Sequence, residues 1–358
     1  MSLGSITAEQ LAHLAKVTLA ELGENKWTDI ALDLQEYCIL PKLLKKNKVQ
    51  IESGESIEKR VKTGNSGNAK MVGLYGVDQT NEGTDWAVSN IPWRHAEASW
   101  VLDKRKISMN RQPRRIVSLV KGARHGAMSD LAELMEDQGW SSTLAAKDSY
   151  GIPMWITVPA SYTADGFTGA NPSGFSSGIG LDSTAQGNEN WKNWHGQYAS
   201  VTKSDLIRRM RESSHKTHFK APVPHDSYEG SKDSYSDNYG YYTDYDTLEL
   251  LTEEAEKQND NLGMDVAPAD GKVVFMRRPI TWVPKLDNIT VFSGHANPIF
   301  GVCWDCMEYT FLEGEYMRES APAVKSGQHN VVESFVDLTF NLNCTNRRRN
   351  FVLTKAAA

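Results

Sequence analysis

The sequence predicts an α+β fold in which one long helix packs beside strands from distant parts of the chain. Residues 113–140 place apolar side chains at helical spacing. Residues 336–344 alternate strictly, with Val336, Leu338 and Phe340 on one face and polar residues on the other. Such alternation is typical of a strand with one buried face and one solvated face.

Composition limits the class of protein. The chain has 358 residues, of which 40% are hydrophobic and 23% are charged, so a packed globular core is expected. The net charge of -6 argues against a dedicated nucleic-acid binder, which usually carries a basic excess. We expect no membrane span, since no run of 18 apolar residues occurs. The first residues lack the pattern of a signal peptide, so folding in a cytoplasm is expected.

The helix over 113–140 is the strongest predicted element. Pro113 suits a first helical turn, and the pattern continues to about Trp140, which gives about 40 Å of helix. Its apolar stripe should form the core of this helix, and it includes Ile116, Leu119, Leu131 and Leu134.

Two stretches before this helix read as strands, residues 48–63 and residues 93–107. We expect them to frame a long antiparallel hairpin, with a Gly- and Asn-rich tip that carries a short apolar patch at 71–75. The second strand ends in Asp-Lys-Arg-Lys at 103–106, charged on both faces. An isolated ribbon is marginal in water, so its supporting surface could belong to another subunit.

The remaining elements are shorter. Helices are predicted at 7–22, 27–40, 203–214 and 246–260, and strands at 150–160, 272–284 and 298–312. Thr202 and Asp205 should cap the helix that begins at 203. The loop at 222–246 is rich in Tyr and Asp, a composition that favours a protein interaction surface.

A nucleophile elbow is suggested by Gly174-Phe-Ser176-Ser-Gly178, which matches G-x-S-x-G. An elbow needs an apolar strand before the serine and a helix after it, and neither flank qualifies. A cytoplasmic serine hydrolase using Ser176 therefore stays an alternative, and we expect no enzymatic activity.

Metal and redox chemistry have two candidate clusters. His215, His218, His225 and Asp226 could gather a metal, but exposed polar side chains are the favoured interpretation. Cys303-Trp-Asp-Cys306 has redox or zinc spacing, but no second pair completes a zinc set. Two small buried side chains are favoured there, so we predict no metal and no cofactor.

Several segments carry a family resemblance, and they do so in order along most of the chain. They are "IPWRHAEASWVLDKRKISMN", "IVSLVKGARHGAMSDLAELMEDQGW", "GIPMWI", "GFTGANPSG", "EKQNDNLGMD", "RRPITWVP" and "NCTNRRRNFVL". This set resembles a group of tailed-bacteriophage major capsid proteins. The likeness is weakest over the first 40 residues and the Tyr/Asp loop.

The resemblance implies the tailed-phage major capsid fold, called Hong Kong ninety-seven-like, and it implies a division of the chain. Residues 1–47 would form an N-terminal arm, and residues 48–110 an extended loop. Residues 111–149 and 326–358 would form a peripheral domain that contains the long helix as its spine. Residues 150–325 would form an axial domain.

The resemblance also implies a function. Such a subunit self-assembles into hexamers and pentamers of an icosahedral phage head that encloses double-stranded DNA, which it contacts non-specifically. Portal, scaffolding and decoration proteins would be further partners, and assembly in the bacterial cytoplasm would place the protein in the virion. An encapsulin-like compartment shell is the related alternative. The extended loop would lie on a neighbouring subunit, with contacts expected at Lys59, Arg60, Trp93, Arg94, Trp100, Lys104, Arg105 and Lys106.

Overall fold

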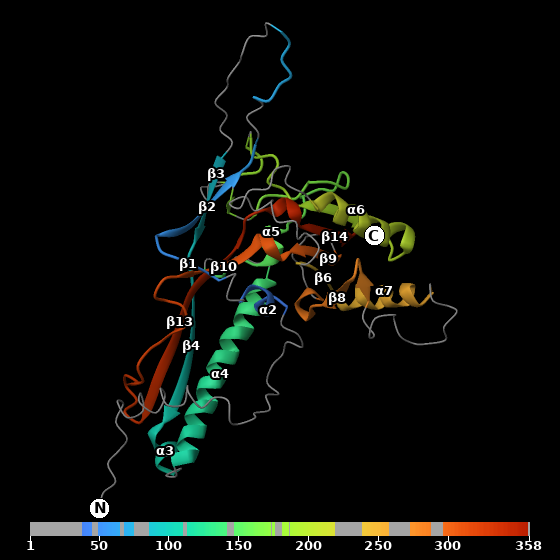
Figure 1. Ribbon diagram of the computed structural model, residues 1–358. Helices are drawn as coiled ribbons and strands as arrows, with labels where there is room; N and C mark the ends of the chain where they lie inside the picture. The colour runs from blue at the N-terminus through green and yellow to red at the C-terminus, as the bar shows by residue number, and fades with distance from the viewer. Residues whose placement is uncertain are drawn as a thin grey trace, which may run out of the picture.

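A computed structural model of the chain shows two sheets, a projecting ribbon and one long helix (Figure 1). The residues described are 38–44, 49–64, 68–74, 86–109, 113–141, 147–172, 174–175, 181–185, 187–218, 238–257, 273–287 and 296–356. The predicted helix at 7–22, and the one at 27–40 up to residue 37, lie outside them.

The first sheet is organised around one strand, β13 (Val331–Cys344). Strand β4 (Arg94–Asp103) pairs antiparallel with it, from Asp103 opposite Val331 to Arg94 opposite Phe340. Three other strands also pair antiparallel with β13: β12 (Ala323–Val324), β11 (Arg318–Glu319) and β10 (Met307–Leu312). Strand β1 (Gln50–Glu52) adds to β10 in parallel.

Helix α4 (Pro113–Gly139) covers one face of the first sheet and runs beside β4 (Figure 1). In β4, Ala98, Trp100 and Leu102 are buried, and the residues between them are exposed, as the alternation predicts. Glu319 ties the layers together, because it accepts from Arg124 of α4 at 2.5 Å and from the Trp100 indole at 3.3 Å.

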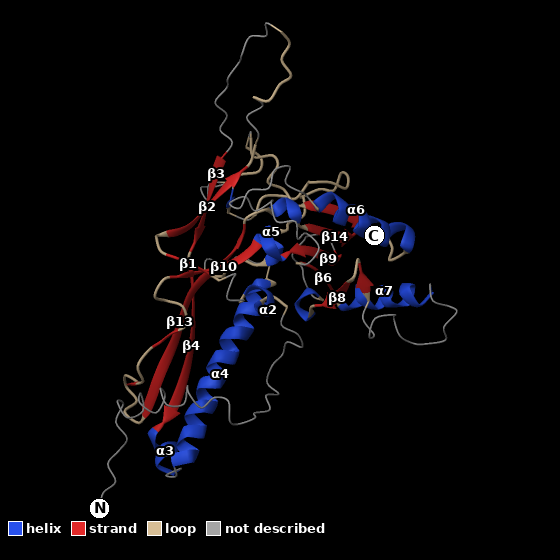
Figure 2. Cartoon of the chain, in the orientation of Figure 1, coloured by secondary structure: helices blue, strands red, loops and turns tan. Residues whose placement is uncertain are grey.

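The second sheet has the strand order β5-β14-β9-β6-β8-β7. Its strands are β5 (Trp194–Tyr198), β6 (Tyr239–Thr243), β7 (Val274–Phe275), β8 (Arg278–Trp282), β9 (Ala296–Cys303) and β14 (Phe351–Lys355). A π-helical turn, η2 (Lys203–Ile207), continues into α6 (Arg208–Thr217), which packs on β5 and β14. Helix α7 (Tyr245–Lys257) packs on β8 (Figure 2).

Short helical turns complete the described chain. They are α2 (Leu40–Leu43), α3 (Lys104–Met109), α5 (Ile152–Trp155), η4 (Pro284–Leu286), η5 (Trp304–Cys306) and η6 (Arg347–Arg349). The strand predicted at 150–160 is wrong, because Pro153 starts a helical turn and all four residues of α5 are buried.

The long hairpin predicted from 48–63 and 93–107 is wrong in its pairing. Strand β2 (Ser56–Lys62) pairs instead with β3 (Trp86–Pro92), and β4 belongs to the first sheet. Period-two alternation gives the faces of a strand but leaves its partner open. Residues 48–110 therefore do not form one hairpin, since β1 and β4 lie in the first sheet and only β2 and β3 pair as a ribbon.

The expected boundaries of the two domains also need correction. Strands β10, β11 and β12 lie in the first sheet, although they fall within 150–325. Strand β14 lies in the second sheet, although it falls within 326–358. The apolar stretch at 298–312 is two strands joined by η5, and each strand enters a different sheet.

The apolar stripe of α4 is only partly a core. Leu131 is 1% exposed, and Leu119 is half-buried against the same core. The side chain of Ile116 lies outside the described residues. Leu134 is 40% exposed, so its expected place in the core is wrong. A helix that rests on one sheet buries a narrow stripe, and Leu134 falls beside it.

Helix α4 also holds the end of the N-terminal arm. Glu136 is 1% exposed, and its carboxylate accepts the backbone N–H groups of Cys38, Ile39 and Leu40 at 2.7–3.1 Å. The Trp140 indole also donates to it at 3.2 Å. A carboxylate at the first N–H groups of α2 satisfies donors that no helix can pair internally.

A buried cation fixes the turn between the sheets. Arg347 follows β13, is 0% exposed, and its guanidinium stands 4.7 Å from the centre of the Trp191 ring. It donates at 2.7–3.1 Å to five neutral acceptors, namely Trp155 O, Trp191 O, Ala170 O, Thr157 Oγ1 and Asn193 Oδ1. Burial without a carboxylate lowers the pKa of Arg347 to about 10.

We expect Leu131→Asp to abolish folding of the subunit. The new carboxylate would be buried without a partner, at a cost of several kcal/mol, which is comparable to a typical folding margin of about 5–15 kcal/mol. Leu134→Asp is the matched control and should cost only about 1–2 kcal/mol, through lost partial burial and lower helix propensity. Urea unfolding followed by circular dichroism separates the two, and equal effects would contradict the assigned face.

We expect Arg347→Lys to destabilise the subunit by about 3 kcal/mol or more, because an ammonium cannot replace a planar fork that serves five acceptors. Arg348→Lys is the control: Arg348 is partly exposed and donates to Asn190 Oδ1 at 3.0 Å. It should cost less than about 1 kcal/mol. The same unfolding measurement applies, and a tolerated Arg347→Lys would show that the network is dispensable.

Candidate functional site

The β2–β3 ribbon projects from the rest of the molecule (Figure 1) and is not hydrogen-bonded to either of the two large sheets. It is a separate two-stranded sheet, in which Ser56 lies opposite Pro92 and Lys62 opposite Trp86. Residues 68–74, beyond its far end, lie well away from both sheets in Figure 1. An isolated pair of strands is marginally stable in water, so this ribbon needs further contacts.

The root of the ribbon is fixed to its own chain. Ile57 and Ile91 face each other and are 0% exposed, as part of the hydrophobic core. The Trp93 indole donates to Gly54 O at 2.9 Å. Val61 and Ala87 also pack against this core, and Asn190 Nδ2 donates to Thr63 O at 3.3 Å, so one face of the ribbon is attached along the length of its strands.

Lys59 strengthens this root with an ionic contact. Its ammonium lies 2.5 Å from Glu52 and 3.0 Å from Glu308, and Glu308 accepts from Asn343 at 3.2 Å. Burial lowers the pKa of Lys59, but the two carboxylates outweigh it, and the pKa lies above its usual value. Lys59, expected to contact a neighbour, is therefore engaged within its own subunit.

One face of the ribbon and its tip expose large apolar side chains. Arg60 lies opposite Val88, and Lys62 opposite Trp86. Trp86 is 65% exposed and Val88 is 40% exposed. Beyond them, Met71, Val72 and Leu74 are exposed as well. We call the group Arg60, Lys62, Met71, Val72, Leu74, Trp86 and Val88 the ribbon surface. Apolar side chains gathered on a projecting element mark an interaction site.

The other predicted contact residues are not on this surface. Trp100 is 3% exposed in its own core, so its expected contact with a neighbour is wrong. Arg94 was also expected to contact a neighbour, but its guanidinium lies 6.0 Å from the centre of the Tyr150 ring of its own subunit. Lys104, Arg105 and Lys106 form the first turn of α3, at the end of β4 remote from the ribbon (Figure 1).

The charged stretch after β4 has a local explanation. The Asp103 carboxylate accepts the backbone N–H of Arg105 at 2.8 Å, as a residue at the start of a helix does. Lys104 N–H donates to Asn330 O at 2.8 Å. The chain turns there from strand to helix, so the charged residues 103–106 do not need a neighbouring subunit to pack against.

The sequence analysis did not identify Trp86 and Val88 as candidate contact residues. The signal that could have found them is the presence of large apolar residues within a Gly- and Asn-rich stretch.

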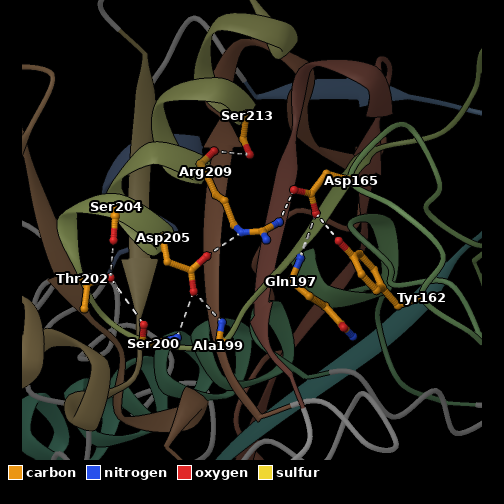
Figure 3. A network of polar contacts seen from close by, with 10 residues as sticks. All are labelled: Tyr162, Asp165, Gln197, Ala199, Ser200, Thr202, Ser204, Asp205, Arg209 and Ser213. Atoms are coloured by element: carbon orange, nitrogen blue, oxygen red, sulfur yellow. Dashed lines mark hydrogen bonds and ion pairs between the residues drawn. The ribbon is translucent and has the colours of Figure 1, made fainter.

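A second cluster of charges lies beside the second sheet (Figure 3). Arg209 of α6 pairs with Asp205 at 2.8 Å and with Asp165. Asp165 accepts from Tyr162 OH at 2.7 Å and from Gln197 N at 3.2 Å. The cluster joins α6, β5 and the chain at 162–165, and every group in it has a partner. The geometry of this cluster suits a structural role, in which it holds α6 against β5, rather than catalysis.

Asp205 shows how this cluster starts the helix. Its carboxylate accepts Ala199 N–H at 2.7 Å and Ser200 N–H at 3.0 Å (Figure 3). Burial raises the pKa of Asp205, but these bonds and Arg209 outweigh it, and the pKa is lowered. The Thr202 side chain makes no capping bond, and the Thr202 N–H donates to Ser200 O rather than to Asp205, so the predicted capping box is wrong.

The candidate metal and catalytic residues do not assemble into a site in the described part of the chain. There, no three His, Cys, Asp or Glu side chains come together as metal ligands. His218 instead stacks on Tyr239, with ring centres 4.4 Å apart. Ser176, His225 and Asp226 lie outside the described residues. No described helix is long and apolar enough to cross a membrane.

Comparison with known proteins identifies the fold. No protein family model matches the sequence, and no curated protein matches it either. A solved capsid of a native GTA particle is 13% identical, with a TM-score of 0.58, and the match covers 96% of this chain and 99% of that one. A cyanophage A-1(L) capsid matches at 13% identity and a TM-score of 0.54, over 96% and 99% of the two chains.

A third solved structure, the capsid of cyanophage P-SCSP1u, is 11% identical with a TM-score of 0.52, over 95% of each chain. In all three cases the match covers 95% or more of this chain, so the similarity extends over nearly the whole chain. The predicted fold class is confirmed: this chain has the α+β, Hong Kong ninety-seven-like fold of phage capsid proteins.

Proposed function

We propose that this protein is the major capsid subunit of a tailed phage, a structural protein without enzymatic activity. Its copies would form the hexamers and pentamers of an icosahedral head around double-stranded DNA. Support comes from the fold, which the chain shares over nearly its whole length with solved capsid subunits. The observation that carries the proposal is the ribbon surface, whose large apolar side chains stay exposed among the residues that the structure describes.

The occupant proposed for the ribbon surface is a second copy of this chain. Trp86 and Val88 supply apolar area, Arg60 and Lys62 supply positive charge on the same face of the two strands, and Met71 and Leu74 add apolar area beyond the strands. The subunit as a whole carries a net charge of -6, so a neighbouring copy offers acidic partners for these cations. A closed shell repeats such a contact at every subunit, so a modest contact energy per ribbon is sufficient.

The acidic balance also fits a container for DNA. Binding through many phosphate contacts would need a basic excess and would hold the DNA tightly. A subunit with a net charge of -6 can enclose DNA with weak, non-specific contacts. The portal, scaffolding and decoration proteins of such a head would be its other partners, with assembly in the host cytoplasm before the virion forms.

Two other functions make different predictions. An encapsulin-like shell would use the same fold around protein cargo, so purified particles would lack nuclease-protected DNA. A serine hydrolase would lose esterase activity on Ser176→Ala. Electron microscopy of the purified protein addresses all three, because capsomers or closed particles are expected only for a shell.

We expect that shortening the ribbon prevents shell assembly but leaves the subunit folded. Residues 60–88 would be replaced by Asn-Gly, a two-residue turn that suits the paired ends Lys59 and Ser89. The root contacts of Ile57, Ile91 and Lys59 remain, but the packing of Val61 and Ala87 on the core is lost, so circular dichroism should match the intact chain and melting should stay cooperative at a lower temperature. Sedimentation and electron microscopy should then show subunits or small oligomers and no closed particles.

Two point variants control for the size of that change. Trp86→Ser should raise the critical concentration for assembly at least tenfold, because it removes the exposed Trp86 ring from the ribbon. Trp86→Tyr keeps an aromatic ring and should assemble nearly as the intact chain does. Full-sized particles from the shortened chain would contradict the proposed role of the ribbon, and an unfolded product would place the ribbon in the subunit's own core.

A further inference from the structure

Cys303 and Cys306 lie where the chain leaves the second sheet for the first. Strand β9 ends at Cys303, the 3₁₀ turn η5 spans Trp304–Cys306, and β10 begins at Met307. Side chains three residues apart eclipse each other in a 3₁₀ turn. The two Sγ atoms are accordingly 3.6 Å apart, with the Cys306 thiol donating to Cys303.

The surroundings of the pair favour thiolate chemistry. The Arg349 guanidinium reaches within 4.0 Å of Cys306 Sγ, and Tyr239 packs against both cysteines. The hydrogen bond from Cys306 lowers the pKa of the Cys303 thiol, and the Arg349 charge lowers it too, against the effect of burial. The thiolate is the form of cysteine that reacts with oxidants. Both sulfurs are buried, so a reagent must be small and uncharged.

We propose that Cys303 and Cys306 form a redox-active dithiol that a small peroxide converts to an intrachain disulfide. Cys303 thiolate attacks one oxygen of hydrogen peroxide, the O–O bond breaks, and a proton completes the departing water, leaving a sulfenic acid. The Cys306 sulfur then attacks the Cys303 sulfur, its thiol proton leaves with the hydroxyl as a second water, and the S–S bond forms. Two thiols lose two electrons in total, and one peroxide gains them.

The geometry favours the disulfide over further oxidation of one sulfur. Closing the gap from 3.6 Å to about 2.0 Å needs only a small side-chain movement, because the partner thiol already points at Cys303. The product would staple η5, the joint at which β9 and β10 diverge into different sheets. Oxidation would therefore stiffen the connection between the two sheets without breaking any hydrogen bond of either sheet.

The test uses the full chain with its four cysteines reduced. The folded protein is exposed to dilute hydrogen peroxide, then denatured and alkylated with N-ethylmaleimide, and the peptides are identified by mass. We expect a peptide with a Cys303–Cys306 disulfide, two hydrogen atoms lighter than the reduced form, appearing at least tenfold faster than oxidation at Cys38 or Cys344. Dithiothreitol should restore both thiols.

Two variants complete the test. Cys344→Ser keeps the pair and should form the disulfide at an unchanged rate. Cys306→Ser removes the resolving thiol, so a sulfenic acid should persist at Cys303 and be trapped by dimedone that is added together with the denaturant. The proposal is overturned if Cys303 in the intact chain goes on to sulfinic acid, if its disulfide partner is Cys38 or Cys344, or if both thiols survive peroxide as long as Cys38 does.

Discussion

The architecture depends on one strand, β13, which pairs with other strands along both of its edges. β13 is 14 residues long, and β4 pairs along one edge while β12, β11 and β10 follow one another along the other. Backbone groups buried at the centre of a sheet must find partners, so this single strand sets the register of all four neighbours. Because α4 rests on β4, the same strand indirectly positions the long helix.

The end of β13 transmits this order to the second sheet. The chain leaves β13 through η6 and enters β14, which pairs with β5 on one side and β9 on the other. Arg347 sits in that turn and binds carbonyl groups from segments near 155, 170 and 191. A buried cation without a carboxylate is tolerated only when its donors are satisfied, so these segments must converge on it. The two sheets are thereby joined by a polar anchor within an apolar core.

The ribbon differs from the two sheets in the large apolar side chains that it exposes. In the two sheets and their helices, the Arg209 cluster pairs its charges, and several large aromatic side chains pack edge to face, as Trp155 does with Tyr150 and Phe175. The ribbon surface has neither form of compensation. A subunit built this way is stable through its two sheets, while its most exposed apolar groups stay free to bind another molecule. The proposed role in a shell rests on this difference between the ribbon surface and the two sheets.

The sequence by itself determined the periodic features of this protein. The long helix from Pro113, the alternation that buries Trp100 and Leu102, and the strand around Phe340 all follow from local spacing, which reflects the geometry of the helix and the strand. The resemblance of its segments was sufficient for the fold class. Only the tertiary structure decided which strands pair, because every strand shares the same period of two. It assigned β4 to β13 rather than to the ribbon, separated β9 from β10, buried Arg347, and left Leu134 and Trp86 exposed. Each of these outcomes depends on contacts between residues far apart in the chain, and no local pattern encodes such contacts.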